Sequence, residues 1–367
     1  MSSSSNNFSA AVPAAIPGRG PAINPPNRFE RLHVACDAET WQTDLDGMPD
    51  ERPDPRTQFF YDATESILAR NDSPDIPFSY GINAYRGCEH GCAYCFARPY
   101  HEYLGWSSGL DFETKILVKL RAPELLRKEL SARKWQPQMV TMSGATDCYQ
   151  PAERHFRLTR QCLEVFAEFR NPVGLITKNF LITRDRDILA ELARHRCVSA
   201  HITVTTLDSK LAGKLEPRAA RPEHRLRAIR MLADAGVPVG VMVAPVIPGL
   251  TDHEIPAILD AAKTAGARTA GYVVLRLPHA VKDVFCAWLD QHAPSKKERV
   301  LARVRELRGG QLYVSEWGSR MHGEGIFAEQ IHDLFAVAVR RAGLDKNFNT
   351  TTTENFRRPG GVQLDLF

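Results

Sequence analysis

The stretch GCEHGCAYC, residues 87–95, decides how this chain is interpreted. Its three cysteines, Cys88, Cys92 and Cys95, follow the spacing C-x-x-x-C-x-x-C. Three thiolates on one short loop can hold three corners of a [4Fe–4S] cube, which four cysteines normally close. The sequence therefore predicts a cluster with one iron open to a ligand that chelates it.

The same loop allows two other interpretations. A structural zinc site needs four ligands, which usually come in two pairs. His90 offers a fourth ligand, but no second C-x-x-C lies nearby. A disulfide is the weaker alternative, because eight cysteines without a signal peptide are typical of a reducing compartment. The spacing of the motif favours the cluster over both.

The composition is that of a globular protein. Hydrophobic residues make up 43% and charged residues 25% of the 367 residues, enough for one large α/β domain with appendages or for two domains. Residues 1–7, MSSSSNN, lack the basic and apolar regions of a secretory signal, and no apolar run is long enough to cross a membrane. We therefore expect a cytoplasmic protein with no membrane partner. The net charge of +4 is compatible with nucleic-acid binding but does not favour it.

Composition also predicts how the chain is divided. Residues 1–30 are rich in Ser, Asn, Ala, Pro and Gly and are expected to be disordered. Residues 31–77 form an N-terminal extension interrupted by prolines. Residues 78–280 form the main α/β unit. Residues 281–344 form a helical extension, and residues 345–367 form a flexible tail.

From residue 78 onward, short apolar runs alternate with amphipathic segments. We expect strands at 79–86, 139–143, 173–177, 200–206, 237–245 and 269–276, and helices at 123–133, 153–170, 185–194, 223–235, 253–265, 294–308 and 326–341. Ala-Gly pairs at 235–236 and 265–266 are typical of helix C-caps. This alternation predicts an α/β fold with a parallel sheet.

The cysteine loop, with Tyr94 directly before its last cysteine, resembles the signature of the radical S-adenosylmethionine (radical SAM) superfamily. The resemblance covers residues 79–280 and is closest to spore photoproduct lyase and its uncharacterised bacterial relatives. Residues 143–151, 176–179, 215–217 and 245–249 carry the likeness to that branch. It implies a partial (β/α)6 TIM-like barrel, whose chemistry lies at the C-terminal ends of the strands. It also implies a [4Fe–4S] cluster and S-adenosylmethionine, which together release a 5′-deoxyadenosyl radical.

The resemblance also assigns roles to individual residues. It implies that Cys88, Cys92 and Cys95 ligate the cluster, that Tyr94 lies along the adenine, that Ser143, Gly144 and Thr146 meet the methionyl and ribose groups, that Lys178 pairs with the carboxylate of S-adenosylmethionine, and that Thr205 bonds the ribose or methionyl end. Each has a plainer interpretation as a turn residue or a surface charge.

Cys148 marks a departure from the branch. Spore photoproduct lyase uses a hydrogen-donating cysteine a few residues before the position of Asp147, where this chain has Gly144 or Ala145. Cys148 follows Asp147 instead, so it is either a displaced hydrogen donor or a small core residue, the commoner fate of a free cysteine. The remaining cysteines, Cys36, Cys162, Cys197 and Cys286, match no metal spacing and are predicted to be structural.

The last five residues suggest a partner. Gln363, Leu364, Asp365, Leu366 and Phe367 resemble the pentapeptide by which bacterial polymerases and repair proteins hold the replication sliding clamp. A few apolar anchors can carry most of such binding. A tail that folds back onto its own core is the alternative.

Three functions are open at this point. The first is a radical SAM enzyme that acts on DNA, in lesion repair like that of spore photoproduct lyase, with flavodoxin or ferredoxin as electron donor. The second keeps the chemistry but acts on RNA, a peptide or a small metabolite. The third is a non-enzymatic clamp-binding protein with a structural metal site.

Overall fold

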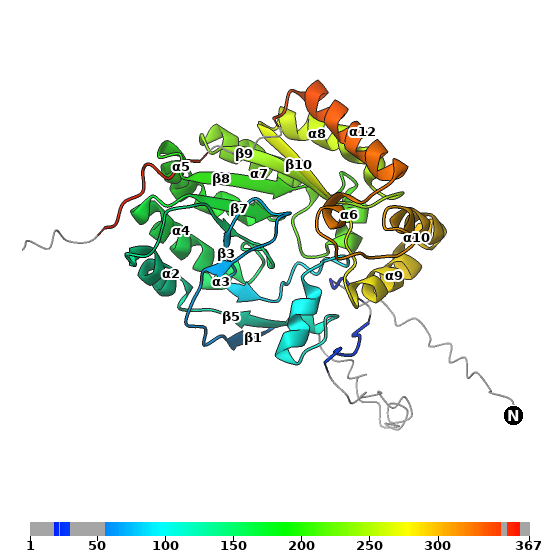
Figure 1. Ribbon diagram of the computed structural model, residues 1–367, viewed down its shortest axis with the longest axis horizontal. Helices are drawn as coiled ribbons and strands as arrows, with labels where there is room; N and C mark the ends of the chain where they lie inside the picture. Colours follow the sequence, from blue (N-terminus) through cyan, green and yellow to red (C-terminus); the bar gives the residue numbers. More distant parts are fainter. Residues whose placement is uncertain (1–17, 22, 30–55, 346–350, 360–367) are drawn as a thin grey trace, which may run out of the picture.

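A computed structural model describes residues 18–21, 23–29, 56–345 and 351–359 (Figure 1). Its main sheet has seven strands in the order β10-β9-β8-β7-β6-β3-β2. Their bounds are β2 Ala69–Arg70, β3 Tyr80–Ile82, β6 Val140–Met142, β7 Val173–Thr177, β8 Val198–Thr203, β9 Val239–Val246 and β10 Thr269–Val274. Each of the six predicted strand regions contributes a strand to this sheet, and those from 173–177 onward shift by at most three residues.

In the main sheet, the strands β3, β6, β7, β8, β9 and β10 run parallel to one another. The edge strand β2 pairs antiparallel with β3. Among the described residues β10 does not pair with β3, so the sheet is open. The α/β class is confirmed, and six parallel strands in this order are consistent with a partial barrel. Nearly every strand residue is buried or half-buried, as expected for a parallel sheet covered on both faces.

The helices between these strands pack against one another in strand order, from α2 to α8. Their bounds are α2 Ala122–Ser131, α3 Glu153–Phe156, α4 Leu158–Phe169, α5 Arg186–Arg194, α6 Ser209–Leu215, α7 Pro222–Asp234 and α8 Ile255–Thr264, with 3₁₀ turns η2 Phe180–Asp185 and η3 Asp252–Glu254. Gly236 and Gly266 follow α7 and α8 with φ of 79° and 104°. Both helices therefore end where predicted, at a glycine with positive φ. Glycine adopts this left-handed backbone conformation without steric cost.

The region around the first predicted strand differs from the prediction. Residues 79–86 break into β3 and β4 (Tyr85–Arg86), and β4 joins a separate sheet of order β1-β5-β4. β1 (Gln58–Tyr61) and β5 (Lys115–Val118) were not predicted. All four residues of β1 are exposed, so they give no buried-strand pattern in the sequence.

Residues 281–345 are mostly helical. The elements are α9 Val281–His292, η4 Pro294–Lys296, α10 Lys297–Glu306, α11 Ser319–His322 and α12 Ile326–Ala342. α10 and α12 were predicted, and α9 was not. α12 packs against α8 and extends the ring of helices (Figure 1). Among the described residues no helix has the length and apolarity needed to cross a bilayer.

Two segments expected to lack structure lie against the body. The side-chain amide of Asn27 donates to Glu102 O at 2.9 Å, and the backbone of Gly20 donates to Glu113 at 3.3 Å. In the other segment, Arg357 N donates to Phe169 O at 2.8 Å, and Phe356 packs on the core. The predictions of disorder over 1–30 and of a flexible tail over 345–367 are therefore wrong for residues 18–21, 23–29 and 351–359. Polar composition hid these contacts, because most of them are hydrogen bonds.

Candidate active site

The cysteine loop leaves β4 at the edge of the sheet. Backbone hydrogen bonds fix it at both ends: Cys88 N donates to Phe112 O at 2.9 Å, and Ala93 N donates to Leu215 O at 3.0 Å. Cys88 and Cys92 are buried, Cys95 is half-buried, and all three thiols are free. Two short helices follow the cysteine loop in the chain, the 3₁₀ helix η1 (Arg98–Leu104) and the α-helix α1 (Asp111–Thr114).

The three thiols lie close enough to influence one another. Burial, followed by the charges of Asp147, Cys92 and Cys95, raises the pKa of Cys88 well above its ordinary value. Burial likewise raises the pKa of Cys92 and Cys95. In the absence of a cation, burial keeps these three neighbouring thiols protonated. Iron binds cysteine as the thiolate, so a cationic iron–sulfur group would deprotonate them on binding. The donor set therefore fits a [4Fe–4S] cluster.

The geometry does not support a zinc site. Within the described ranges, no three His, Cys, Asp or Glu side chains converge as ligands of a single ion. Both ring nitrogens of His90 are occupied: Nδ1 lies 3.3 Å from Asp147 Oδ2, and Nε2 lies 3.0 Å from the Asn179 amide. His90 is thus a positioning residue that joins the cysteine loop to β6 and β7, rather than a fourth metal ligand.

Arg98 binds the backbone of the cysteine loop, a role that the sequence did not predict. Its side chain is fully buried, and two of its nitrogens donate to Cys92 O at 3.0 and 2.8 Å. A third donates to Gly109 O at 2.8 Å, and the guanidinium pairs with buried Glu113 at 2.6 Å. A buried charge is tolerated only when it is paired and hydrogen-bonded, and Arg98 satisfies both conditions. Its position three residues after Cys95 was the only signal in the sequence.

Asp147 links the loop to β7 of the main sheet. It accepts hydrogen bonds from Thr177 Oγ1 at 2.7 Å and from Lys178 N at 2.8 Å, and it faces His90. Burial alone would raise the pKa of Asp147, but His90 and these hydrogen bonds lower it to about 2. The carboxylate is therefore charged and fixes Lys178 at the end of β7.

Tyr94 and Thr205, both predicted to contact S-adenosylmethionine, meet at Glu216. The Tyr94 hydroxyl donates to Glu216 Oε1, and Thr205 Oγ1 donates to the same oxygen at 2.7 Å. The buried guanidinium of Arg225 pairs with the other carboxylate oxygen. Burial opposes ionisation of Glu216, but Arg225 and then Lys178 lower its pKa to about 2. Residues 215–217 were singled out as a motif, although no role was predicted for Glu216.

Lys178 lies within the same group. Its ammonium is 6.0 Å from the centre of the Tyr94 ring and donates to Ala244 O at 3.3 Å. Its charge acts on Cys92, Cys95 and Glu216. A lysine beside the cluster cysteines, with one backbone bond and two further donors, can take the carboxylate of an amino acid ligand.

Ser143, Gly144 and Thr146 form the turn after β6. Ser143 has φ of 78°, and its hydroxyl accepts from Cys148 N at 2.8 Å. Asn83 Oδ1 accepts from Thr146 N at 3.2 Å, and Thr146 Oγ1 donates to Tyr85 O at 3.1 Å. The hydroxyls of Ser143 and Thr146 thus shape the turn, and their contact with S-adenosylmethionine stays a prediction.

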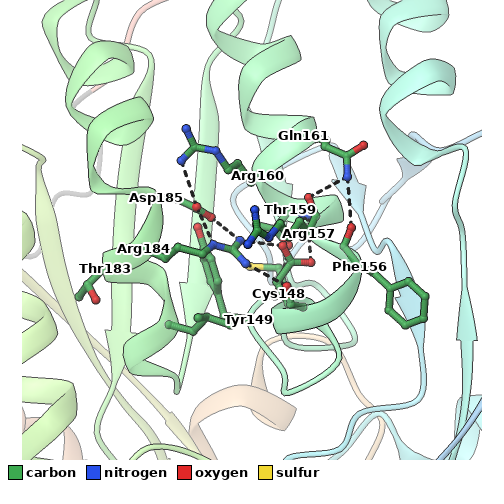
Figure 2. Close-up of polar contacts among 12 residues, drawn as sticks. Cys148, Tyr149, Phe156, Arg157, Thr159, Arg160, Gln161, Thr183, Arg184 and Asp185 are labelled. Carbon is green, nitrogen blue, oxygen red and sulfur yellow. Dashed lines mark hydrogen bonds and ion pairs between the residues drawn. The ribbon is translucent and has the colours of Figure 1, made fainter.

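Cys148 is 5% exposed and belongs to the main apolar core. Thr159 Oγ1 donates to its carbonyl at 2.6 Å (Figure 2). Burial, followed by the charge of Asp147, raises the pKa of the Cys148 thiol well above its ordinary value. These surroundings suit a core residue, and its role as hydrogen donor stays a prediction.

A hollow of about 440 Å³ lies elsewhere, where η2, α5 and α7 meet. Its lining residues are Phe180, Leu181, Thr183, Arg184, Arg186 and Met231. None of the predicted site residues lines it. The site is therefore defined by the cysteine loop and its neighbours and not by the hollow.

These features define a class of α/β proteins in which a three-cysteine loop at the sheet edge can carry an iron–sulfur cluster. Residues 82–262 match the Radical SAM superfamily. The chain belongs to the radical SAM superfamily, whose members use a [4Fe–4S] cluster and S-adenosylmethionine. Its cofactors are thus as predicted, and Cys88, Cys92 and Cys95 would hold the cluster.

Several proteins are similar to this chain in sequence. An uncharacterised protein of Mycobacterium tuberculosis (strain ATCC 25618 / H37Rv) is 36% identical over 234 residues, which cover 63% of this chain and 68% of the relative. One from Methanocaldococcus jannaschii is 29% identical over 178 residues, covering 48% of this chain and 63% of the relative. A radical SAM Nalpha-GlyT isomerase of Pseudomonas phage M6 is 26% identical over 168 residues, covering 46% of this chain and 33% of the isomerase.

Among solved structures, the fold is similar to spore photoproduct lyase complexed with dinucleoside spore photoproduct. The TM-score is 0.57 at 14% identity, and the match covers 78% of this chain and 80% of the lyase. A mutant of the lyase with bound AdoMet and dinucleoside spore photoproduct also gives 0.57, at 15% identity and the same coverage. The likeness shows a shared fold.

Proposed function

We propose that this protein is a radical SAM enzyme that acts on DNA and repairs a lesion by lyase-like chemistry. The observation that carries the proposal is the likeness of its fold, over 78% of the chain, to a lyase complexed with a dinucleoside photoproduct. The superfamily supplies the chemistry, and the substrate is inferred from this likeness.

Each residue of the site has a task in this scheme. When bound, the cluster and S-adenosylmethionine supply a 5′-deoxyadenosyl radical by one-electron cleavage of a carbon–sulfur bond. Lys178 pairs with the carboxylate of S-adenosylmethionine, while the Glu216 hydrogen bond fixes the Tyr94 ring against the adenine. A base or sugar of DNA then gives up a hydrogen atom. A lesion within a duplex has to leave the stack to reach the site.

We also propose two partners. Residues 363–367 bind the bacterial sliding clamp, and flavodoxin or ferredoxin delivers the electron. The pentapeptide lies outside the residues that the structure describes, so this part rests on sequence alone. Removing residues 363–367 should abolish micromolar binding to the clamp in solution, and equal binding without them would refute the interaction.

Anaerobic turnover tests the substrate. The protein is reconstituted with iron and sulfide, reduced, and given S-adenosylmethionine with ultraviolet-damaged oligonucleotides, undamaged oligonucleotides, RNA or no nucleic acid. We expect damaged DNA to change the yield of 5′-deoxyadenosine and to be converted to undamaged product only when S-adenosylmethionine and reductant are both present. A yield that ignores DNA but rises with RNA, a peptide or a metabolite would overturn the DNA assignment and leave the radical chemistry intact.

A further inference from the structure

Four exposed aromatic side chains lie under arginine guanidinium groups. They are Phe29, Phe96, Tyr103 and Trp317, 40–68% exposed, with Arg28 over Phe29 and Tyr103, Arg276 over Phe96, and Arg320 over Trp317 at 4.0–5.4 Å from the ring centres. We call these seven residues the aromatic–arginine surface. A single exposed aromatic side chain needs no explanation. Four exposed rings that each lie under an arginine suggest a binding surface.

Contacts join the Phe96 and Trp317 parts of this surface. Arg276, over Phe96, donates to the sulfur of Met321 at 3.4 Å. Arg320, the neighbour of Met321 in α11, pairs with Asp75 at 2.5 Å, and Arg276 also acts electrostatically on Asp75. The two ring-and-arginine pairs are therefore adjacent.

The Phe29 and Tyr103 part is joined through the loop after β10. The rings of Phe29 and Tyr103 lie 5.0 Å apart, and the segment containing Phe29 lies beside η1, the cyan helix of Figure 1. Burial, followed by the nearby charges of Arg28 and Lys282, lowers the pKa of His279 in that loop. Arg28 thus lies near the loop that contains Arg276.

This surface borders the proposed active site. Phe96 directly follows the cluster cysteine Cys95, and Arg276 lies two residues beyond β10. Both positions follow C-terminal ends of strands or the cysteine loop, the side where barrel enzymes carry their chemistry. Phe96 and Arg276 therefore lie beside the cysteine loop, on the side where a substrate would meet the cluster.

Arg276 keeps a buried hydrogen-bond donor that nothing in the described part of the chain accepts. Its Nε is buried and makes no hydrogen bond, and within the described part of the chain no carboxylate forms an ion pair with it. Arg308, also without such an ion pair there, lies close enough that burial and then Arg276 lower its pKa to about 10. Asp75 lies within electrostatic reach of Arg276, and Glu324 within reach of Arg308, but neither carboxylate forms an ion pair with these arginines. Two adjacent arginines without an ion pair can accept an anionic ligand.

Bases and phosphates are the groups that such a surface recognises. An exposed ring face can stack on a base only when that base has left the duplex, and base–aromatic stacking tolerates any sequence. A guanidinium binds a phosphate in a planar, two-point manner. Alternating rings and arginines therefore match an unpaired strand better than a duplex, whose bases are covered.

We propose that the aromatic–arginine surface binds the unpaired strand of the DNA substrate, with bases stacked on Phe96 and Trp317 and a phosphate held by Arg276. This inference rests on the proposed function and adds the form of the substrate and its path to the cluster.

Fluorescence anisotropy with a labelled single-stranded DNA 12-mer tests the surface, using the reconstituted full chain. We expect Trp317→Ala to weaken binding about tenfold with an unchanged salt dependence, since it removes one base-stacking ring and no charge. We expect Arg276→Gln to weaken binding and to lower the slope of log affinity against log salt by about 0.7, the loss of one phosphate contact on a single strand. Arg341→Gln is the matched control, because Arg341 is an exposed arginine of α12 paired with Asp260.

The outcomes separate the surface from the function. Binding that is weakened by Trp317→Ala and Arg276→Gln, but not by Arg341→Gln, supports the surface. Wild-type binding that neither variant changes refutes the surface and leaves the proposed function standing. No wild-type binding to any DNA refutes both, and tighter binding to duplex DNA or to RNA of the same sequence refutes the assignment of an unpaired DNA strand. Circular dichroism and cluster absorbance equal to those of the wild type show that the variants fold.

Discussion

The main sheet with its helices, which is consistent with a partial barrel and which we call the barrel body, is held together differently from the surroundings of the cysteine loop. The strands β6 to β10 and helices α4 to α8 contribute most of the main core, and their apolar side chains recur at the periods of strands and helices. The cysteine loop is instead held by buried charges and backbone contacts. Arg98 pairs with Glu113, and Glu216 pairs with Arg225.

This difference predicts where the molecule is sensitive. A buried ion pair adds little net stability compared with an apolar pair, but removing one partner leaves an uncompensated charge and is costly. Loss of a methylene in the barrel opens a small cavity at a smaller cost. Substitutions around the loop should therefore damage both stability and chemistry, and conservative ones in the barrel should damage neither severely.

Arg98→Ala is expected to have the largest effect. It leaves Glu113 buried without its cation and frees the carbonyl of Cys92, so we expect a loss of about 3–5 kcal/mol in the free energy of unfolding and a loss of bound iron. Urea unfolding and iron analysis measure both. Arg121→Ala is the control, since Arg121 forms an ion pair with Glu124 on the surface, where solvent screens the charges and the pair adds little stability. Equal effects of the two substitutions would contradict the comparison.

Glu216→Gln tests the second buried pair through pH. The folded-state pKa of Glu216 is about 2, below its ordinary value of 4.5. The charge therefore stabilises the fold above pH 4.5, and this contribution is lost as pH falls toward 2. We expect wild type to exceed the variant by roughly 3 kcal/mol at pH 7 in urea unfolding. The difference should shrink below pH 4.5, and a constant difference down to pH 2 would show that the charge is not the cause.

Gly20→Ala tests the segment that lies on the loop. A Cβ at Gly20 would come within 1.7 Å of Gly91 O, in the cysteine loop. Because backbone cannot yield as a side chain does, we expect a loss of about 1–3 kcal/mol and faster proteolysis near Arg19. Gly213→Ala is the control, since a Cβ there meets nothing within 4 Å and alanine favours its helix, α6. A thermal melting shift common to both variants would refute the contact.

Ile202→Val is expected to have the smallest effect. Ile202 is fully buried in β8, and losing one methylene should cost about 0.5–1.5 kcal/mol. Cleavage of S-adenosylmethionine should be unchanged, because Ile202 belongs to the main apolar core and not to the apolar cluster that contains Cys92 and Tyr94. A cleavage rate that falls with stability would show that the two regions are not separable in this way.

The sequence predicted the barrel better than the site. Apolar periodicity located β7, α5 and α7 to within a few residues, because the apolar residues of each segment recur at the spacing of its buried positions. It missed β1, whose exposed residues show no such period, and Arg98, whose partners lie 6 to 15 residues away across a turn. The motif identified the cysteines and Tyr94, but Glu216, 122 residues from Tyr94, had no local signal of its role.

Reductive cleavage of S-adenosylmethionine by wild-type protein and by Cys92→Ala tests the central claim most directly. Both are reconstituted anaerobically with iron and sulfide, reduced with dithionite, and analysed for 5′-deoxyadenosine and for the absorbance of the cluster. The three-cysteine site predicts 5′-deoxyadenosine from the wild type and none from Cys92→Ala, whose loop has lost a ligand. Cleavage that persists in Cys92→Ala, or that is absent from a wild-type protein carrying a full cluster, would contradict it.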